Sequence, residues 1–442
     1  MRFIEPMRFY SLKNYKHTAS FEEAITHGLA PDKGLYFPEK IPLLSKNFLH
    51  NLYKKNIYDI AFQLIHPFIG GSIPDNILFS IITDTLKFPF TTQNIDKNLD
   101  VLELYQGPTM AFKDIGAKFM AGCLGYFMGK KDSYITVLVA TSGDTGAAVA
   151  NGFLKVKGIK VVILFPSKRV SKLQEKQLTS LGENIISLEI DGDFDDCQKL
   201  VKKAFLDSYL NMNRHLTSAN SINIARWLPQ IFYYCIAARA IEKKESKVIF
   251  SVPSGNFGNI CAGILGERMG LPISLFIAST NENDTIPRFM CYPIYEPKKA
   301  KFTLSNAMDV ADPSNFIRIL ALYSNNEELR NNMIAYKFTD NQTLIAMQDI
   351  WKQLNYMLDP HGAVSFLGIM KYLKKKIGLD TVGISLETAH PIKFSDKIQE
   401  PLKTNISLPN NCNYYFKTDK NYYRLSTKYE EFREFLLDTN LR

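Results

Sequence analysis

The sequence predicts an α/β protein built on parallel sheets, and three observations lead to that prediction. Short runs of β-branched residues end in glycine-rich turns that open into helices of small residues, which is the alternation typical of βαβ units. The chain has 442 residues, enough for two or three domains with an extensive core. Its 46% hydrophobic and 22% charged residues are typical of a globular chain, so wholesale disorder and fibrous architectures are excluded.

The individual elements can be placed in chain order. The first hundred residues predict mixed helices and short strands, with turns at Gly28, Pro31, Gly34 and Gly70-Gly71. Beyond them, we expect an alanine-rich helix after Gly146 and a helix over Ile260–Met269. The buried strands that alternate with helices are expected at Tyr134–Ala140, Lys160–Phe165, Lys247–Val252, Leu271–Ala278 and Thr381–Leu386.

The segment Ser254-Gly-Asn-Phe-Gly-Asn259 lies where a buried strand is expected to run into a helix. Free backbone N–H groups and the helix dipole make such a loop a natural phosphate site, and its glycines let the backbone approach the anion closely. The segment has neither the Gly-Lys-Ser/Thr ending of a Walker A loop nor the glycine spacing of a dinucleotide fingerprint. A non-nucleotide phosphate is therefore favoured, although a turn that binds nothing gives the same pattern.

A second loop, Thr141-Ser-Gly-Asp-Thr-Gly146, has the same strand-to-helix setting and offers hydroxyl and N–H donors suited to a carboxylate. Asp144 conflicts with this interpretation unless its carboxylate points away from the ligand or itself accepts N–H bonds. Taken alone, the loop fits a plain turn better than a ligand site.

Lys113 lies in Gly107-Pro-Thr-Met-Ala-Phe-Lys-Asp-Ile-Gly116, where Pro108 marks a turn and the residues beyond it predict the start of a helix. Among apolar neighbours, the lysine can have a lowered pKa and act as an imine-forming amine. A surface lysine near a helix N-terminus is the plainer alternative. Asp114 is ambiguous, because the helix dipole favours acids in a first turn regardless of function.

Charge and composition limit the partners. The chain carries 53 Lys and Arg against 44 Asp and Glu, a formal charge of +9, which favours anionic partners. The basic runs, such as Lys298-Lys299, are short and scattered, so we expect no nucleic acid. No run approaches the roughly 18 apolar residues of a spanning helix, and no signal-peptide region follows Met1, so we expect a cytoplasmic chain without a membrane partner. The six cysteines and seven histidines show no ligand spacing, which argues against a metal.

A reactive lysine, a phosphate loop and a carboxylate loop are together the parts of a pyridoxal-phosphate (PLP) enzyme that acts on an amino acid. With them, the sequence resembles the threonine synthases, PLP-dependent enzymes of fold type II (tryptophan synthase β-like), in the short form without the plant regulatory extension. The resemblance covers nearly the whole chain and includes, in the family's order, Ser20–Ala24, Gly28–Pro38, Ala219–Arg226, Thr303–Val310 and Leu386–Pro391.

The resemblance implies two parallel-sheet α/β domains with the cofactor in the cleft. It divides the chain into an N-terminal segment over residues 1–100, a domain with the lysine and the carboxylate loop over 101–225, and a domain with the phosphate loop and a C-terminal segment over 226–442.

The resemblance also implies roles for single residues. Lys113 matches the Schiff-base lysine, and Thr388 matches the residue whose hydroxyl meets the pyridine nitrogen, although locally Thr388 also fits a cap or turn after a strand. A hydroxyl cannot hold that nitrogen protonated as a carboxylate would, which makes elimination away from Cα plausible. The positions that hold the cofactor phosphate are Gly255, Asn256, Phe257 and Asn259, and those expected to contact substrate are Thr141, Ser142, Thr145, Asn220 and Arg226.

Asn220, Asn223 and Arg226 follow one another at a spacing of three, which predicts three side chains near one face of a helix. Arg226 can either grip a substrate phosphate as a bidentate donor or belong to a structural network at a helix terminus. His361 and His390 fit satisfied structural histidines better than catalytic ones.

The implied reaction converts O-phospho-L-homoserine and water to L-threonine and phosphate, the last step of threonine biosynthesis, in a monomer or homodimer. Lys113 would be the catalytic residue of this lyase and PLP its cofactor. One rival is another fold type II enzyme, such as a threonine dehydratase or cysteine synthase, which acts on a substrate without a γ-phosphate. The other is a non-catalytic PLP-binding homologue, against which Lys113, both loops and Thr388 argue.

Overall fold

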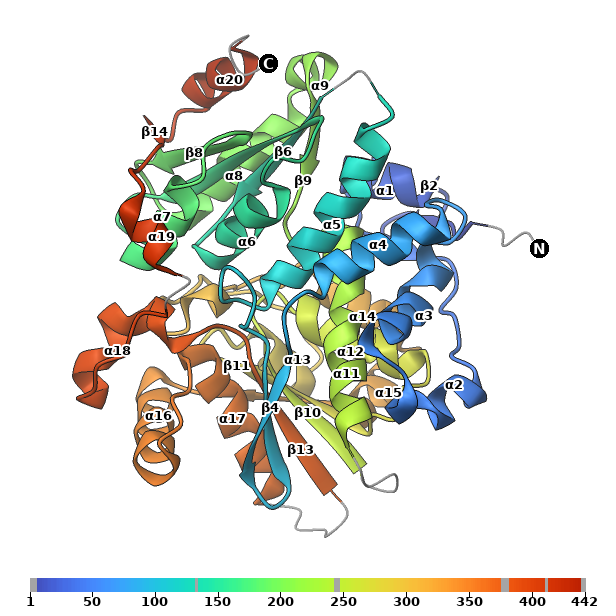
Figure 1. Ribbon diagram of the computed structural model, residues 1–442, viewed down its shortest axis with the longest axis vertical. Helices are drawn as coiled ribbons and strands as arrows, with labels where there is room; N and C mark the ends of the chain where they lie inside the picture. Colours follow the sequence, from blue (N-terminus) through green and yellow to red (C-terminus); the bar gives the residue numbers. More distant parts are fainter. Residues whose placement is uncertain (1–5, 132–133, 242–246, 375–380, 410–411, 439–442) are drawn as a thin grey trace.

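The computed structural model describes residues 6–131, 134–241, 247–374, 381–409 and 412–438, and it confirms the α/β class with parallel sheets. Two sheets lie in separate parts of the molecule, one in the upper and one in the lower half of Figure 1. A small antiparallel sheet of β2 (Thr18–Ala19), β1 (Phe9–Ser11) and β3 (Tyr36–Pro38) stands apart near the N-terminus.

The larger sheet has six strands, all parallel except β4, which pairs antiparallel with β5. Its order is β12 (Met333–Lys337), β11 (Leu275–Thr280), β10 (Lys247–Pro253), β13 (Thr381–Glu387), β5 (Leu99–Glu103) and β4 (Thr91–Asp96). The inner strands β10 and β11 are almost wholly buried, as expected of a parallel sheet covered on both faces.

The smaller sheet has five parallel strands. Its order is β14 (Tyr423–Leu425), β8 (Ile185–Ile190), β7 (Ile159–Pro166), β6 (Ile135–Ala140) and β9 (His215–Ser218). Each parallel sheet thus combines strands that lie far apart in the chain. The strands β4 and β5 precede all strands of the smaller sheet in sequence but belong to the larger sheet, and the C-terminal β14 belongs to the smaller sheet. The three-part division of the chain stays a prediction.

Helices cover both sheets and connect their strands. The helices between the start of α5 and the end of the smaller sheet's β9 in the chain are α5 (Lys113–Met128), α6 (Asp144–Phe153), α7 (Lys172–Thr179), α8 (Phe194–Leu206) and α9 (Ser208–Asn213). The helices that follow, up to β13 of the larger sheet, are α10 (Ile224–Trp227), α11 (Ile231–Ala240), α12 (Gly258–Arg268), α13 (Thr285–Cys291), α14 (Phe316–Leu322), α15 (Asn326–Asn332), α16 (Asp340–Leu354) and α17 (Pro360–Leu373). Short 3-10 turns lie at η1 (Leu52–Lys54), η2 (Leu228–Gln230), η3 (Asn306–Met308) and η4 (Pro391–Phe394).

The two ends of the chain pack on the rest of the fold. The N-terminal helices are α1 (Phe21–His27), α2 (Lys46–His50), α3 (Ile57–Ile69) and α4 (Asp75–Thr85), and α4 packs along α5. The C-terminal segment carries α18 (Ser395–Leu402), α19 (Asn413–Lys417) and α20 (Tyr429–Leu437), and it runs from the larger half along the left edge of Figure 1 to the smaller sheet. The largest apolar cluster joins residues of α3, α4, α5, α11 and α12 and of both parallel sheets, so one core supports both halves.

Most elements predicted from the sequence are confirmed within one to three residues at their ends. The prediction of a strand from Leu271 was wrong at its start, because β11 begins at Leu275. The Leu271 N–H donates to the Gly266 carbonyl at the end of α12, and Pro272 has no N–H to offer a neighbouring strand.

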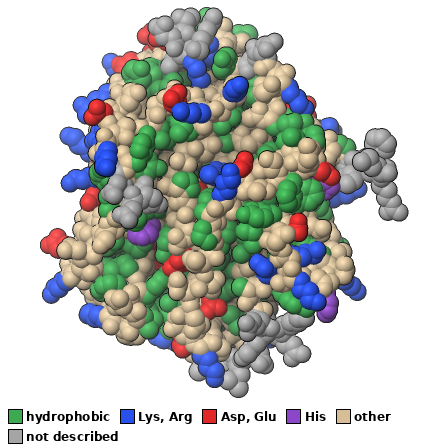
Figure 2. All heavy atoms as spheres, in the orientation of Figure 1, with side chains coloured by type: hydrophobic (Ala, Val, Ile, Leu, Met, Phe, Trp, Pro, Cys, Tyr) green, Lys and Arg blue, Asp and Glu red, His purple; other side chains and the backbone are tan. Residues whose placement is uncertain are grey.

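Charge is mixed on the face shown in Figure 2, where Lys and Arg side chains are dispersed among acidic and apolar ones. On this face the positive charge does not form the stripe that a nucleic-acid strand would follow. No helix among the described residues is long and apolar enough to span a bilayer.

Candidate active site

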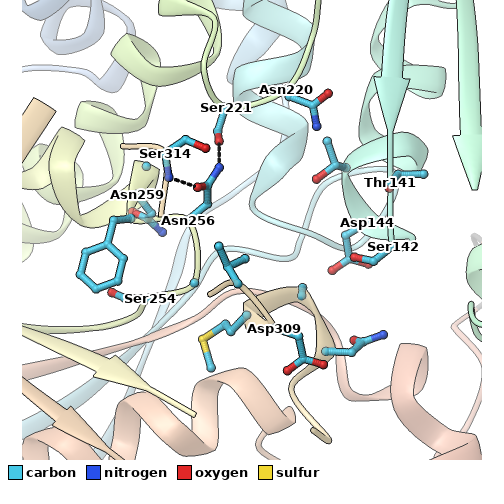
Figure 3. A pocket seen from close by; sticks show the side chains of 18 of the residues that line it. Thr141, Ser142, Asp144, Asn220, Ser221, Ser254, Asn256, Asn259, Asp309 and Ser314 are labelled. Atoms are coloured by element: carbon cyan, nitrogen blue, oxygen red, sulfur yellow. Dashed lines mark hydrogen bonds between the residues drawn. The ribbon is translucent and has the colours of Figure 1, made fainter. Parts of the chain in front are cut away.

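A cavity of about 650 Å³ lies between the two parallel sheets, at the ends of their strands. Its lining includes Thr141 just after β6, Ser254 just after β10 and Thr388 just after β13. In Figure 3, Thr141, Ser142 and Asp144 lie on one side of the cavity, while Ser254, Asn256 and Asn259 lie on the other. Open α/β sheets bind ligands at the carboxyl ends of their strands, so this cavity is the default ligand site.

Lys113 is the first residue of α5 and lines the cavity, with 18% of its side chain exposed. The turn before it is rigid. The Phe112 N–H donates to the Thr388 carbonyl at 2.9 Å, which fixes the start of α5 to the end of β13. The carboxylate of Asp114 accepts the Thr109 N–H at 2.9 Å and the Thr109 hydroxyl at 2.6 Å, so this ambiguous acid holds the turn together.

The amine of Lys113 lies in a strongly charged environment. Its Nζ is 3.8 Å from Oδ2 of Asp144, at the start of α6. Burial lowers the pKa of Lys113; the charges of Lys393 and Arg226 act in the same direction, and Asp144 opposes them. A lysine with a lowered pKa has more neutral amine near pH 7, which is the form that attacks carbonyls and accepts protons.

Asp144 does not present a bare carboxylate to the cavity. Its Oδ1 is 2.7 Å from the Nζ of Lys393 and accepts a hydrogen bond from Nε2 of Gln174 at 2.9 Å. Burial alone would raise the pKa of Asp144, but the charges of Lys393 and Lys113 outweigh burial and hold it below its usual range. The conflict expected between this acid and an anionic ligand is therefore removed by the buried Lys393 and by the hydrogen bond from Gln174.

The loop after β10 has the features of an anion cradle. Phe257 adopts left-handed backbone geometry (φ +59°), and α12 begins at Gly258, so its first-turn N–H groups have no partner within the helix. A β-carbon at Gly255 would lie 2.6 Å from the Cα of Met308, so only glycine fits there. Asn259 accepts the Tyr234 hydroxyl on Oδ1 at 2.7 Å, while its buried Nδ2 has no partner among the described residues. An unpartnered buried donor beside a free helix N-terminus suits a bound phosphate.

Asn256 ties this loop to its surroundings. Its Nδ2 donates to the Ser221 hydroxyl at 2.7 Å, and its Oδ1 accepts the Ser314 N–H at 2.6 Å, as the dashed lines in Figure 3 show. Because both ends of the amide are used, Asn256 can serve an anion through its backbone and through the shape of the loop.

The loop after β6 is organised by Thr141. Its hydroxyl oxygen accepts the Gly143 N–H at 2.9 Å and the Gly146 N–H at 2.8 Å. Gly143 has φ +135°, and a β-carbon there would lie 2.4 Å from Gln174, so the turn requires glycine. Ser142 and Thr145 are half-buried and line the cavity, where their hydroxyls can face a ligand.

The prediction of one helix face for Asn220, Asn223 and Arg226 was wrong, because α10 begins only at Ile224. The Asn223 side chain caps that helix by accepting the Ala225 N–H, so the chain before it cannot be helical. Asn220 and Arg226 nevertheless line the cavity, and Asn223 does not. Arg226 is buried, which lowers its pKa to about 10, and its Nη1 donates to the Ala219 carbonyl while Nε has no partner among the described residues.

Both histidines have structural partners. Nδ1 of His361 is 2.6 Å from the buried carboxylate of Asp359, and its Nε2 accepts the Ala307 N–H at 3.2 Å. His361 thereby links α17 to η3, the turn that packs on Gly255. His390 accepts the Ile392 N–H as the cap of η4, and burial lowers its pKa.

Sequence reasoning missed Lys393, Gln174 and Ser221. Lys393 lies two residues beyond the motif Leu386–Pro391 and reads as an ordinary surface lysine, yet it is completely buried. Its place within an apolar stretch, Pro391-Ile-Lys-Phe394, was the available signal. Among the residues that the structure describes, no group of three or more His, Cys, Asp or Glu could hold a metal ion.

Comparison with known proteins assigns the chain to a family. The model of pyridoxal-phosphate dependent enzymes matches residues 83–386, flanked by the threonine synthase N terminus at 8–86 and the threonine synthase C-terminal model at 363–436. The threonine synthase of Buchnera aphidicola subsp. Baizongia pistaciae is 40% identical over 98% of this chain and all of its own length.

Two solved structures share the fold over nearly the full length. The crystal structure of threonine synthase from Escherichia coli superposes with a TM-score of 0.90 at 38% identity, covering 98% of this chain and 99% of that one. The PLP-bound threonine synthase from Brucella melitensis gives 0.90 at 32% identity, covering 97% and 98%.

A lysine at a helix start facing a glycine-rich anion loop across two parallel sheets, in a chain that matches the model over 83–386, defines a PLP-dependent enzyme of fold type II. The N-terminal and C-terminal models and the 40% identity over the full length narrow the class further. The chain belongs to the threonine synthase family.

The residues around the cavity fit PLP, which carries a phosphate, an aldehyde and a ring nitrogen. The unpartnered Nδ2 of Asn259 and the cradle at Gly255 suit the phosphate. The amine of Lys113, whose side chain is 18% exposed and lines the cavity, suits the aldehyde. Thr388, which is 6% exposed and lines the same cavity, has a hydroxyl of the kind that suits the ring nitrogen.

Proposed function

We propose that the chain converts O-phospho-L-homoserine and water to L-threonine and inorganic phosphate in this cavity. The observation that supports it most is the meeting of Lys113, the loop at Gly255 and the loop at Thr141 around one space of about 650 Å³. The family membership supports the reaction, and the positions of the residues around the cavity support the roles proposed for them below.

Five residues hold the cofactor in this proposal, together with Lys113. Gly255 and Phe257 shape the loop so that backbone N–H groups face the phosphate, and Asn259 adds its side-chain amide. Asn256 keeps the loop closed through Ser221 and Ser314. Thr388, which lines the same cavity, would offer its hydroxyl to the ring nitrogen.

Lys113 is the general base and acid of the proposed reaction. Bound PLP supplies an electron sink for negative charge that develops on the carbon skeleton of the substrate. The Lys113 amine removes the proton from Cα and later a proton from Cβ, while the γ-phosphate leaves with the electrons of its Cγ–O bond. The protonated Lys113 then returns a proton to Cγ, which becomes the methyl group, and a last proton to Cα once the hydroxyl is in place. Water then supplies the hydroxyl at Cβ. One amine can serve repeatedly because burial and the neighbouring cations keep its pKa low.

The substrate is held at its two anionic ends. Ser142 and Thr145 face the cavity from the loop that Thr141 organises, and they bind the carboxylate. Asn220 and Arg226, whose Nε has no partner among the described residues, contact the phosphate end. Lys202, Lys298 and Lys299 also line the cavity and favour entry of a multiply charged anion.

We further propose that the chain works in the cytoplasm as a monomer or homodimer, without nucleic-acid or membrane partners. The dispersed charge on the face in Figure 2 supports the absence of a nucleic-acid partner.

The experiment is incubation of the purified chain, loaded with PLP, with O-phospho-L-homoserine. Threonine and phosphate should form together in equal amounts. Phosphate without threonine, or turnover of threonine or serine to an oxo acid and ammonia, would contradict the proposal and favour the rivals with related folds.

A further inference from the structure

Lys393 is a buried cation that the proposed mechanism does not use. It lies in η4, its side chain is 0% exposed, and it does not line the cavity. Its Nζ donates to the Thr109 carbonyl at 2.8 Å, in the turn before α5, and lies 2.7 Å from Oδ1 of Asp144. Burying an ammonium is costly unless it is paired and hydrogen-bonded, so this pairing is a built feature of the site.

Asp144 lies between two lysines from different elements. Its Oδ1 faces Lys393 and Gln174, whereas its Oδ2 faces Lys113 at the longer distance of 3.8 Å. The three charged residues come from the starts of α5 and α6 and from η4. The shorter contact and the second hydrogen bond both lie on the side away from Lys113.

The electrostatic consequence depends on Lys393. A buried carboxylate with only one lysine nearby holds that lysine in its charged form, because the two charges stabilise each other. With Lys393 already paired to Asp144, protonation of Lys113 would add a second cation to one carboxylate. The other charged groups that face Lys113 are Arg226, which opposes its protonation, and Asp359, which favours it.

We propose that Lys393 is a positioning residue that engages Asp144 in an ion pair and so leaves the Lys113 amine uncharged and available. The proposal rests on the role given to Lys113 in the proposed function. In this proposal Asp144 anchors Lys393 beside the site. This role explains why an acidic residue lies in a loop that is proposed to bind the substrate carboxylate.

The test measures the reactivity of Lys113 in the full-length chain freed of PLP, from pH 6 to 10, with an amine-acylating reagent and peptide mapping. In Lys393→Met, Asp144 has only Lys113 as a cationic partner, so modification of Lys113 at pH 7 should slow at least about tenfold, the effect of one pKa unit. Lys393→Met combined with Asp144→Asn removes both charges and should restore the rate to within about threefold of the wild type. Lys397→Met, which removes an exposed lysine of α18, should leave it unchanged.

Two results would overturn the proposal. The first is a pH profile of Lys113 acylation that is unchanged in Lys393→Met. The second is slower acylation in Lys393→Met that the double variant does not restore, because a purely structural role of Lys393 predicts slower acylation in both variants. If Lys393→Met does not fold, Asp144→Asn alone decides: Lys113 should react at least as fast as in the wild type, and slower reaction would refute the idea.

These outcomes are separate from those of the proposed function. Borohydride reduction of the PLP-loaded chain reports which lysine carries the cofactor, whereas the acylation profile reports the charge of Lys113 without any cofactor. Trapping on another lysine would refute the proposed function and leave the measured coupling between Lys393 and Lys113 intact.

Discussion

Replacing Gly255 by alanine adds a single methyl group at the point where two loops of the cavity touch. The new β-carbon would lie 2.6 Å from the Cα of Met308 and 3.2 Å from the Ala307 carbonyl oxygen. Ordinary carbon contacts are about 3.5–4.0 Å, so either the loop after β10 or η3 must retreat by roughly 1 Å. Both neighbours are backbone atoms, and no side-chain rotation can relieve the clash.

The cost can be estimated from overpacking. Forcing an extra methyl group into a packed site typically costs about 1–3 kcal/mol. If the loop moves, that strain reduces the affinity for the cofactor phosphate, which corresponds to a roughly 5- to 150-fold higher Kd for PLP. The chemistry of PLP that does bind should change much less, because Lys113 and Thr388 are tied to each other through Phe112, away from Gly255.

PLP titration of the cofactor-free chain, followed by absorbance, measures this effect. Gly266→Ala, at the other end of α12, is the matched control, since its β-carbon would meet side-chain atoms and no backbone, the Cδ1 of Leu271 at 2.9 Å and the Cγ2 of Ile231 at 3.2 Å. It should bind PLP like the wild type. Equal PLP affinity in Gly255→Ala and Gly266→Ala would refute the assignment of this loop to the phosphate.

Three further predictions follow from single contacts. Lys113→Ala should keep the fold by circular dichroism but lose borohydride-trapped PLP and turnover, and trapping that persists would place the cofactor elsewhere. Arg226→Lys should lower kcat/KM for phosphohomoserine roughly tenfold to a hundredfold, about 1.5–3 kcal/mol, with PLP binding unchanged; wild-type kinetics would remove Arg226 from the substrate site. Because the pKa of Asp144 is held below its usual range, its stabilisation is present above about pH 4 and is lost as pH falls further, at up to about 1.4 kcal/mol per pH unit. In urea unfolding between pH 5 and 2, the wild type should therefore lose stability more steeply than Asp144→Asn, and equal slopes would contradict the ion-pair account.

Sequence reasoning placed the fold well because its signals are local. The strand before Thr141 and the strand before Ser254 are apolar runs that end in glycine turns, and both form where such patterns predict. The helix start at Lys113 follows in the same way from the turn at Pro108. The strand expected from Leu271 began late because Pro272 interrupts pairing, a local signal that the hydrophobic pattern outweighed.

The site was harder to predict because its charged residues are far apart in the chain and come together only in the folded structure. Asp144 and Lys393 are 249 positions apart in the chain, and nothing in either segment indicates the other. The spacing of Asn220, Asn223 and Arg226 suggested a helix, but an asparagine is also a strong N-cap, and Asn223 ends the irregular segment before α10. Residue types alone could not decide between these two uses.

The most direct test of the proposed reaction follows oxygen atoms rather than rates. In water enriched in ¹⁸O, the PLP-loaded chain should convert O-phospho-L-homoserine to threonine that carries the label in its hydroxyl group, and to phosphate without label, because the Cγ–O bond breaks and water adds at Cβ. Label in the phosphate together with unlabelled homoserine would show hydrolysis at phosphorus and contradict the account.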